Sequence, residues 1–408
     1  MNNETRKKPE VLAPAGDFEK LQFAVAYGAD AVYIGGTNFS LRANAKNFDT
    51  DQLQKAINYA HNKNVKVYVA VNIFAHNADF EGLEGYFATL KKIGADAVIV
   101  ADLGVFDIAR KIKGLEIHIS TQANTTNYQT ALLYKSLGAS RVVLARELSF
   151  AEITEINEKL RDKMETEVFA HGAMCMAYSG RCLLSNYMTG RDANKGDCAQ
   201  SCRWQYSISE PKRPGEQMPV YQDERGTYIM NSKDLCMVEY IPELVACGTS
   251  SLKIEGRMKS AYYVAVTTNI YRQALDDFFV SPDLYNSKKA YYVDELKKTK
   301  NREFFTGFYF GKPTEGQVQG GTSDKVTQEF VGVVLNYNEE TGFATIEQRN
   351  KFNKGERVEF IKGGFCQVIE EIYTEKGDKV ESAPHPQQIL QIKVCRPVAQ
   401  FDIMRLKT

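Results

Sequence analysis

The segment FEKLQFAVAYGADAVYIGG, residues 18–36, contains the unit that decides the fold. Apolar residues recur at helical spacing up to Tyr27, and Gly28 then ends this pattern before the short apolar run AVYIGG. A glycine in this position is typical of a helix C-terminus, and an uninterrupted apolar run is typical of a buried parallel strand. The segment therefore predicts a helix followed by a strand.

The same unit recurs along the first two thirds of the chain. Gly94 precedes AVIVAD, Gly138 precedes RVVLARE and Gly248 precedes SLKIEGR. Further apolar runs lie between these units: EVLAPAG (10–16), VKVYVAV (65–71), LEIHIST (115–121) and TEVFAHG (166–172). Together they make eight strands alternating with helices, which predicts a (β/α)8 TIM-like barrel. A doubly wound open sheet has the same rhythm, but no GxGxxG motif follows the first strand.

A change of pattern marks a second domain. The Gly-rich stretch GQVQGGTSD, residues 316–324, is typical of a linker, and short period-two runs separated by turn residues follow it. We therefore expect a TIM-like barrel over residues 1–320 and a small all-β barrel over residues 325–408. A packing or oligomerisation role and a substrate-presenting role stay open for the second domain.

Composition limits the class of protein. The 408 residues are 43% hydrophobic, which excludes a disordered chain, and no apolar run approaches the ~20 residues that a membrane helix needs. The opening MNNETRKKPE lacks the apolar stretch of a signal peptide, so we expect a cytoplasmic protein without membrane partners. The 51 basic and 51 acidic residues argue against a generally basic nucleic-acid-binding surface, although not against a local one.

Polar residues cluster where the predicted strands end. Function in such barrels sits at the C-terminal ends of the strands, so these residues become candidates. The candidates for ligand binding are Asn72, Gln122, Asn124, Arg146, Lys253 and Arg257. Several are cations, which suits an anionic ligand. His171 and Glu255 are the candidates for catalytic proton transfer; the alternatives are a structural hydrogen-bonding histidine and a Glu255–Arg257 ion pair.

Four cysteines within 28 residues are the sharpest chemical signal. Cys175, Cys182, Cys198 and Cys202 follow the seventh predicted strand with the spacing C-x6-C-x15-C-x3-C. In a reducing compartment such a group is typical of metal ligands. Only the last pair approaches a zinc knuckle, and iron–sulfur clusters accept irregular spacing, so we favour iron–sulfur over zinc or redox-active thiols. Cys236 is an alternative fourth ligand.

The run EVFAHGAMCMAYSGRCLLS resembles the signature of the collagenase-like peptidase family U32. The segments LAPAGDFEKLQFAVAYGADAVYIGG, NSKDLC, SLKIEGRMKS and NREFFTGF match the same pattern, so the resemblance covers nearly the whole chain. The resemblance implies a barrel with a 4Fe-4S cluster held by Cys175, Cys182 and Cys198, with Cys202 or a later cysteine as the fourth ligand.

The resemblance also implies an activity. In length and layout the chain is most similar to members that hydroxylate tRNA without oxygen, using prephenate to make 5-hydroxyuridine at the wobble position. Arg146, Lys253 and Arg257 would then bind the prephenate carboxylates. The alternatives are rRNA cytidine hydroxylation, a collagenase-like peptidase, and a cluster-bearing subunit that works with a paralogous partner or a second copy of the chain.

Overall fold

The computed structural model describes residues 7–37, 39–40, 47–73, 75–161, 163–174, 184–191, 199, 221–223, 226–228, 233–311 and 329–407. The chain divides into two compact units. The first unit comprises Met1–Val293 and Asn301–Asp324, and the second comprises Asp294–Lys300 and Lys325–Thr408.

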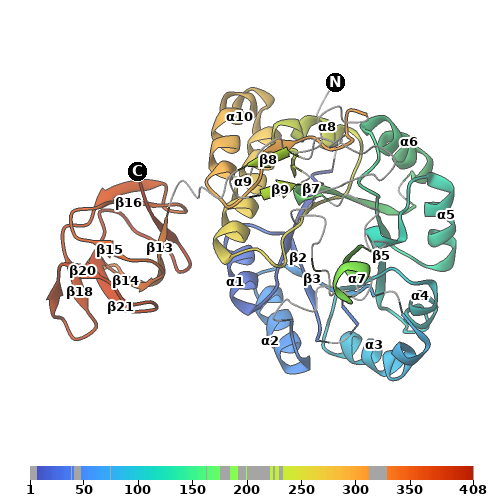
Figure 1. The fold of residues 1–408 in the computed structure, drawn as a ribbon, viewed down its shortest axis with the longest axis horizontal. Helices are drawn as coiled ribbons and strands as arrows, with labels where there is room; N and C mark the ends of the chain where they lie inside the picture. Colours follow the sequence, from blue (N-terminus) through green and yellow to red (C-terminus); the bar gives the residue numbers. More distant parts are fainter. Residues whose placement is uncertain are drawn as a thin grey trace, which may run out of the picture. The chain divides into compact units, whose positions relative to one another are not determined.

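The first unit is a closed barrel of eight parallel strands (Figure 1). The strands are β1 (Glu10–Pro14), β2 (Ala31–Gly35), β3 (Lys66–Val71), β4 (Ala97–Val100), β5 (Glu116–Ile119), β6 (Arg141–Val143), β7 (Glu165–Ala173) and β11 (Ser251–Ile254). Each pairs with the next in this order, and β11 closes the barrel by pairing with both β7 and β1. The TIM-like barrel and all eight predicted strands are confirmed.

Helices form an outer ring around these strands (Figure 1). They are α1 (Phe18–Ala26), α2 (Thr50–His61), α3 (Leu83–Lys92), α4 (Leu103–Ala109), α5 (Tyr128–Leu137), α6 (Phe150–Leu160), α8 (Ile241–Ala246), α9 (Ala261–Val280) and α10 (Pro282–Lys297). The repeated glycines have the predicted role: Gly28, Gly94, Gly138 and Gly248 have φ values of 93°, 90°, 109° and 81°. This left-handed conformation lets the chain leave a helix and enter the next strand.

Shorter elements complete the first unit. The antiparallel strand β10 (Asp234–Cys236) lies beside β7, and β12 (Phe304–Phe305) pairs with β10. Asp234 anchors this edge, because its buried carboxylate accepts hydrogen bonds from the backbone N–H and the guanidinium of Arg302. The remaining elements are α7 (Leu184–Thr189), β8 (Tyr221–Asp223), β9 (Gly226–Tyr228), η2 (Asn77–Phe80), η3 (Thr121–Ala123) and η6 (Val238–Tyr240).

Apart from Asp294–Lys300, which includes the last residues of α10, the second unit is all-β, as predicted. Its antiparallel sheet contains, in spatial order, β17 (Phe365–Val368), β16 (Arg357–Phe360), β22 (Ile403–Leu406), β13 (Phe330–Asn338), β14 (Phe343–Gln348), β21 (Ile389–Lys393), β18 (Ile372–Thr374) and β19 (Lys379–Val380). A separate pair joins β15 (Phe352–Asn353) to β20 (Ser382–Ala383). Alternate residues of β14 are buried, so the period-two pattern marks the side that covers the core.

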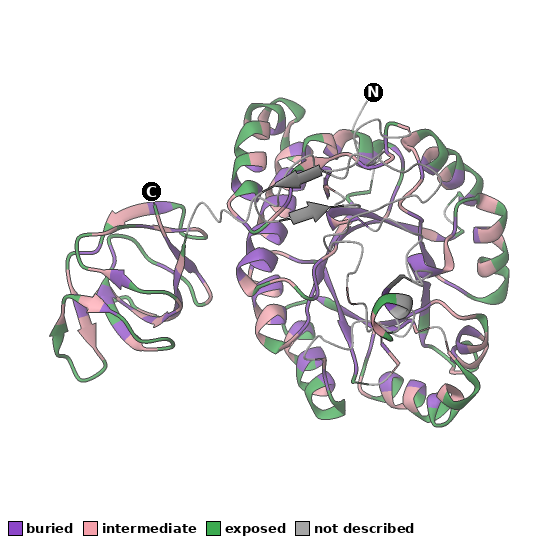
Figure 2. Ribbon diagram, viewed as in Figure 1, coloured by how far each residue is buried: buried purple, intermediate pink, exposed green. Residues whose placement is uncertain are grey.

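Burial follows the layers of each unit. The barrel strands are buried almost throughout, whereas the helices expose their outer faces (Figure 2). Among the described residues, no helix is long and apolar enough to cross a membrane.

Candidate active site

A cavity opens at the C-terminal ends of the barrel strands. Its lining comprises Tyr33, Ala70, Asn72, Ile99, Ser120, Thr121, Gln122, Arg146, Phe169, Lys253, Glu255 and Arg257. Parallel strands bring their carboxyl ends to one end of a barrel, so residues far apart in the chain meet there. Six of the residues proposed from the sequence lie in this lining: Asn72, Gln122, Arg146, Lys253, Glu255 and Arg257.

Arg257 is fixed in the wall of the cavity. Its guanidinium donates hydrogen bonds to Ser40 Oγ at 2.9 Å and to Asn47 Oδ1 at 2.7 Å, and the residue is 4% exposed. Gly35 makes room for it, because a Cβ on Gly35 would lie 2.6 Å from both Nη atoms. The sequence left open an ion pair between Glu255 and Arg257. Among the ion pairs of the described residues, Glu255 pairs with Arg146 and not with Arg257.

Arg146 and Glu255 form a second polar group. The guanidinium carbon of Arg146 lies 3.8 Å from the centre of the Phe169 ring, and its Nη2 lies 3.9 Å from Glu255 Oε2. The same carboxylate oxygen is 3.3 Å from the hydroxyl of Tyr33, which also donates to the Ile254 carbonyl. An arginine stacked on a ring keeps its planar donor face in a fixed direction.

Amide and hydroxyl groups line another side. Gln122 Oε1 accepts hydrogen bonds from Asn72 Nδ2 at 3.2 Å and from Ser120 Oγ. All three residues are less than 10% exposed. This side therefore supplies neutral hydrogen-bonding groups that complement the charged residues opposite.

Lys253 brings a third cation to the cavity. Its Nζ lies 2.7 Å from Oε1 of Glu167, which is fully buried inside the barrel, and 4.5 Å from the centre of the Tyr33 ring. The lining thus carries three cationic residues, Arg146, Lys253 and Arg257, and one carboxylate, Glu255, while Lys253 is also paired with Glu167 below it.

The structure places two candidates outside this lining. Asn124 ends η3 with φ 53°, and its Nδ2 donates to the backbone carbonyl of Gln122 at 3.3 Å. His171 is 1% exposed and is surrounded by the rings of Tyr263, Tyr271 and Phe304. Burial lowers the pKa of its imidazole to about 4, so His171 is neutral near pH 7.

Tyr33 and Phe169 belong to the cavity but were not predicted as site residues. Both lie inside strands and not after them, so a search limited to strand ends passes over them. Their signal is positional: Tyr33 stands two residues before Gly35 at the end of β2, and Phe169 two after Glu167, which lies inside the barrel in β7. Side chains two apart in a strand share a face, so these rings can lie directly below the mouth.

The cysteines Cys175, Cys182, Cys198 and Cys202 lie outside the described residues. Strand β7 ends at Ala173 at the same end of the barrel as the cavity, and the buried Met174 is the last described residue before Cys175. Cys236 is described: it is 8% exposed in β10, opposite His171. Within the described ranges no three His, Cys, Asp or Glu side chains form a group that could hold a metal ion.

Comparison with known proteins fits this architecture. The model described as peptidase family U32 matches residues 16–319, and that of the peptidase family U32 C-terminal domain matches residues 326–405. The tRNA hydroxylation protein P1 of Bacillus subtilis is 43% identical over 98% of this chain and 95% of its own length. The tRNA hydroxylation protein P of Escherichia coli is 37% identical, covering 92% of each chain. A collagenase of Porphyromonas gingivalis is 33% identical over 93% of each chain.

The fold and the cavity define a TIM-barrel protein with a cation-lined mouth and an appended antiparallel β domain. The chain belongs to peptidase family U32.

Proposed function

We propose that this chain is an enzyme that hydroxylates tRNA, producing 5-hydroxyuridine at the wobble position with prephenate as co-substrate and a 4Fe-4S cluster as cofactor. The observation that carries the proposal is the cavity at the barrel mouth, where three cations face one carboxylate. Relatives that are similar over nearly the whole chain are named for tRNA hydroxylation, which supports the substrate class.

The cations would bind the carboxylate groups of prephenate. Arg146 and Arg257 present planar guanidinium groups, which pair with carboxylates through two parallel hydrogen bonds. Each is held in place, Arg146 by the Phe169 ring and Arg257 by Ser40 and Asn47. Lys253 adds a third positive charge, and Asn72 and Gln122 supply hydrogen bonds to neutral groups.

Glu255 is our candidate for proton transfer. It lines the cavity, its side chain is 18% exposed, and Oε2 faces both Tyr33 and Arg146. His171 is the weaker candidate, because it lies outside the lining and is 1% exposed among aromatic rings. A proton-transfer group must reach the reacting atoms, and of these two candidates Glu255 is the one that lines the cavity.

The cluster would be held by Cys175, Cys182 and Cys198, with Cys202 or Cys236 as the fourth ligand. Thiolates are the donor set that such clusters require, and in the sequence Cys175 follows two residues after Ala173, the last residue of β7. When bound, the cluster supplies electron transfer.

Nucleoside mass spectrometry of tRNA and rRNA from a deletion strain tests the proposal. Loss of 5-hydroxyuridine derivatives, restored by the wild-type chain but not by Glu255→Gln or Arg257→Met, is the expected result. Loss of hydroxycytidine from rRNA instead would move the substrate to rRNA. Cleavage of collagen-like peptides by iron-free protein, with tRNA unchanged, would make the chain a hydrolase.

A further inference from the structure

A chain of buried ion pairs runs along the inside of the barrel below the cavity. Glu167 is its centre: it is 0% exposed, and its two carboxylate oxygens face Lys253 Nζ at 2.7 Å and Arg141 Nη1 at 3.3 Å. Lys253 belongs to the cavity lining at the C-terminal end of the strands. Arg141 faces the other way, toward the N-terminal end.

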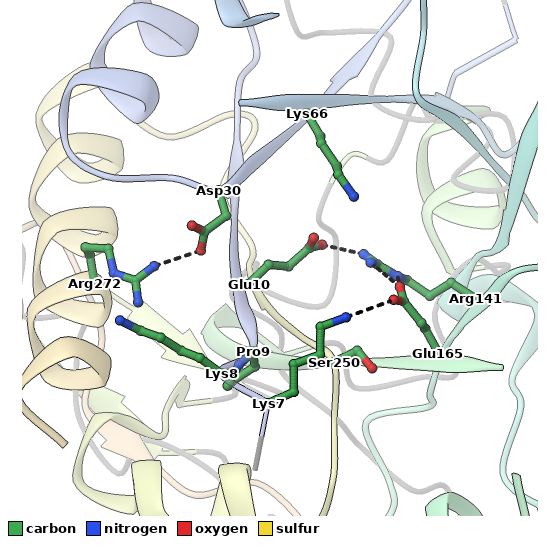
Figure 3. A pocket seen from close by; sticks show the side chains of 10 residues that line it. All are labelled: Lys7, Lys8, Pro9, Glu10, Asp30, Lys66, Arg141, Glu165, Ser250 and Arg272. Carbon is green, nitrogen blue, oxygen red and sulfur yellow. Dashed lines mark hydrogen bonds and ion pairs between the residues drawn. The ribbon is translucent and has the colours of Figure 1, made fainter. Parts of the chain in front are cut away.

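The outer end of this row of ion pairs lies in a pocket at the opposite end of the barrel (Figure 3). There Arg141 forms ion pairs with Glu10 and Glu165, as the dashed lines show. Glu10 also accepts a hydrogen bond from Tyr68 inside the barrel. Arg141 therefore has two carboxylate partners besides Glu167.

The charges around Glu167 explain how a carboxylate is tolerated there. Burial opposes its ionisation, but the cations of Lys253 and Arg141 outweigh that cost and hold the pKa of the Glu167 carboxyl below its usual range. Glu167 consequently carries a negative charge near pH 7 and pairs with the ammonium group of Lys253 from inside the barrel.

We propose that Glu167 is a positioning residue of the cavity, which holds the Lys253 ammonium group in place for an anionic ligand. A lysine has a flexible stem, and its direction is set by the groups that it contacts. Glu167 from below and the Tyr33 ring at 4.5 Å fix Nζ at the cavity floor. The ligand assignment rests on the proposed function, whereas the restraint of Lys253 by Glu167 does not.

The first experiment needs no assumption about activity. Purified full-length chain is treated with a small acylating reagent, and modification of Lys253 is followed by peptide mass spectrometry. Glu167→Gln removes the charge and keeps the side-chain shape, so Lys253 should be modified about tenfold faster than in the wild type. The matched control is Glu165→Gln, which removes another partner of Arg141 and leaves the Lys253 rate unchanged. Equal rates in Glu167→Gln and wild type overturn the inference.

The second experiment separates positioning from general support of the barrel. In a tRNA hydroxylation assay, Glu167→Gln should raise the apparent KM for prephenate about tenfold, with kcat within about twofold. Lys253→Met should behave in the same way, and the double variant should be no worse than either single variant, because both changes remove one interaction. Additive effects, or an equal change in Glu165→Gln, overturn the positioning role.

The two experiments fail in different ways. A wild-type chain that leaves tRNA unmodified contradicts the proposed function, yet the acylation rates still decide the role of Glu167. If Glu167→Gln does not fold, Glu167→Asp replaces it, because this variant keeps the charge and shortens the side chain by about 1.5 Å. Faster acylation of Lys253 in Glu167→Asp supports the inference, and an unchanged rate overturns it.

Discussion

The guanidinium group of Arg257 occupies the space that a side chain on Gly35 would fill. A Cβ on Gly35 would lie 2.6 Å from both Nη atoms of Arg257 and 2.4 Å from Ser40 Oγ. Gly35 ends β2 and Arg257 follows β11, so residues more than 200 positions apart share this contact. The position of Arg257 in the cavity wall therefore requires a residue without a side chain at position 35.

Gly35→Ala should displace Arg257 and lower 5-hydroxyuridine formation about 10- to 100-fold, because a shift of about 1 Å in a binding group is costly. Nucleoside mass spectrometry of tRNA from a complemented deletion strain measures the effect. The control is Gly85→Ala in α3, where a Cβ would meet no atom within 4 Å. This control should retain activity and gain about 0.5–1 kcal/mol in helix stability. Full activity in Gly35→Ala would contradict the role assigned to Arg257.

Arg146→Lys should raise the apparent KM for prephenate about tenfold although the charge is kept. A lysine cannot stack flat on Phe169 or offer two parallel N–H donors to a carboxylate. Steady-state kinetics with varied prephenate measure this. Arg110→Lys is the matched control, because Arg110 pairs with Asp107 on an exposed helix face. An unchanged KM in Arg146→Lys would show that only the charge matters there.

Protein purified without oxygen should be brown and contain iron. The variants Cys175→Ser, Cys182→Ser and Cys198→Ser should each lose most of the bound iron. We expect Cys202→Ser to lose the cluster and Cys236→Ser to keep it. Cys247→Ser is the control. This buried cysteine directly follows α8, and its thiol donates to the carbonyl of Leu244 in that helix. Iron content and absorption near 400 nm are the measurements. Iron loss in Cys236→Ser but not in Cys202→Ser would exchange the two assignments.

The imidazole of His118 should stay neutral to lower pH than in the unfolded chain. Its side chain is fully buried, and burial, together with the nearby Arg141, lowers the pKa of His118. Protons then bind the unfolded chain more readily, so this residue supports folding above about pH 6.5 and that support is lost as pH falls below it. Carbon-13 NMR of labelled histidine measures the titration. A midpoint equal to that in urea-unfolded protein would contradict the prediction.

The sequence was most informative about the barrel, because the same helix–glycine–strand pattern recurs along the first two thirds of the chain. Glycines that end helices marked four of the barrel strands, and short apolar runs between these units marked the other four. Because parallel strands end together, the same pattern also brought Asn72, Arg146 and Arg257 into one group before their contacts were known. The same pattern predicted Asn124 for this group. In the structure Asn124 ends the short helix η3 with a left-handed backbone and lies outside the cavity lining.

Other features depend on contacts between distant strands. His171 lies near the end of β7, yet its ring is enclosed by Tyr263 and Tyr271 of α9 and Phe304 of β12. Glu167 reads as one acidic residue in an apolar run, and only closure of the barrel places it between Lys253 and Arg141.

The sequence by itself determined the barrel, the all-β second unit and the family, because helix ends, strand periods and motif spacing are local properties of the chain. The tertiary structure decided which of the candidate side chains line the cavity, which further residues join them, and what holds them there. Arg257 against Gly35 and Lys253 against Glu167 are each set by strands far apart in the sequence. The direction of a side chain inside a closed barrel follows from its neighbours across the sheet, and those neighbours are known only when the barrel has closed.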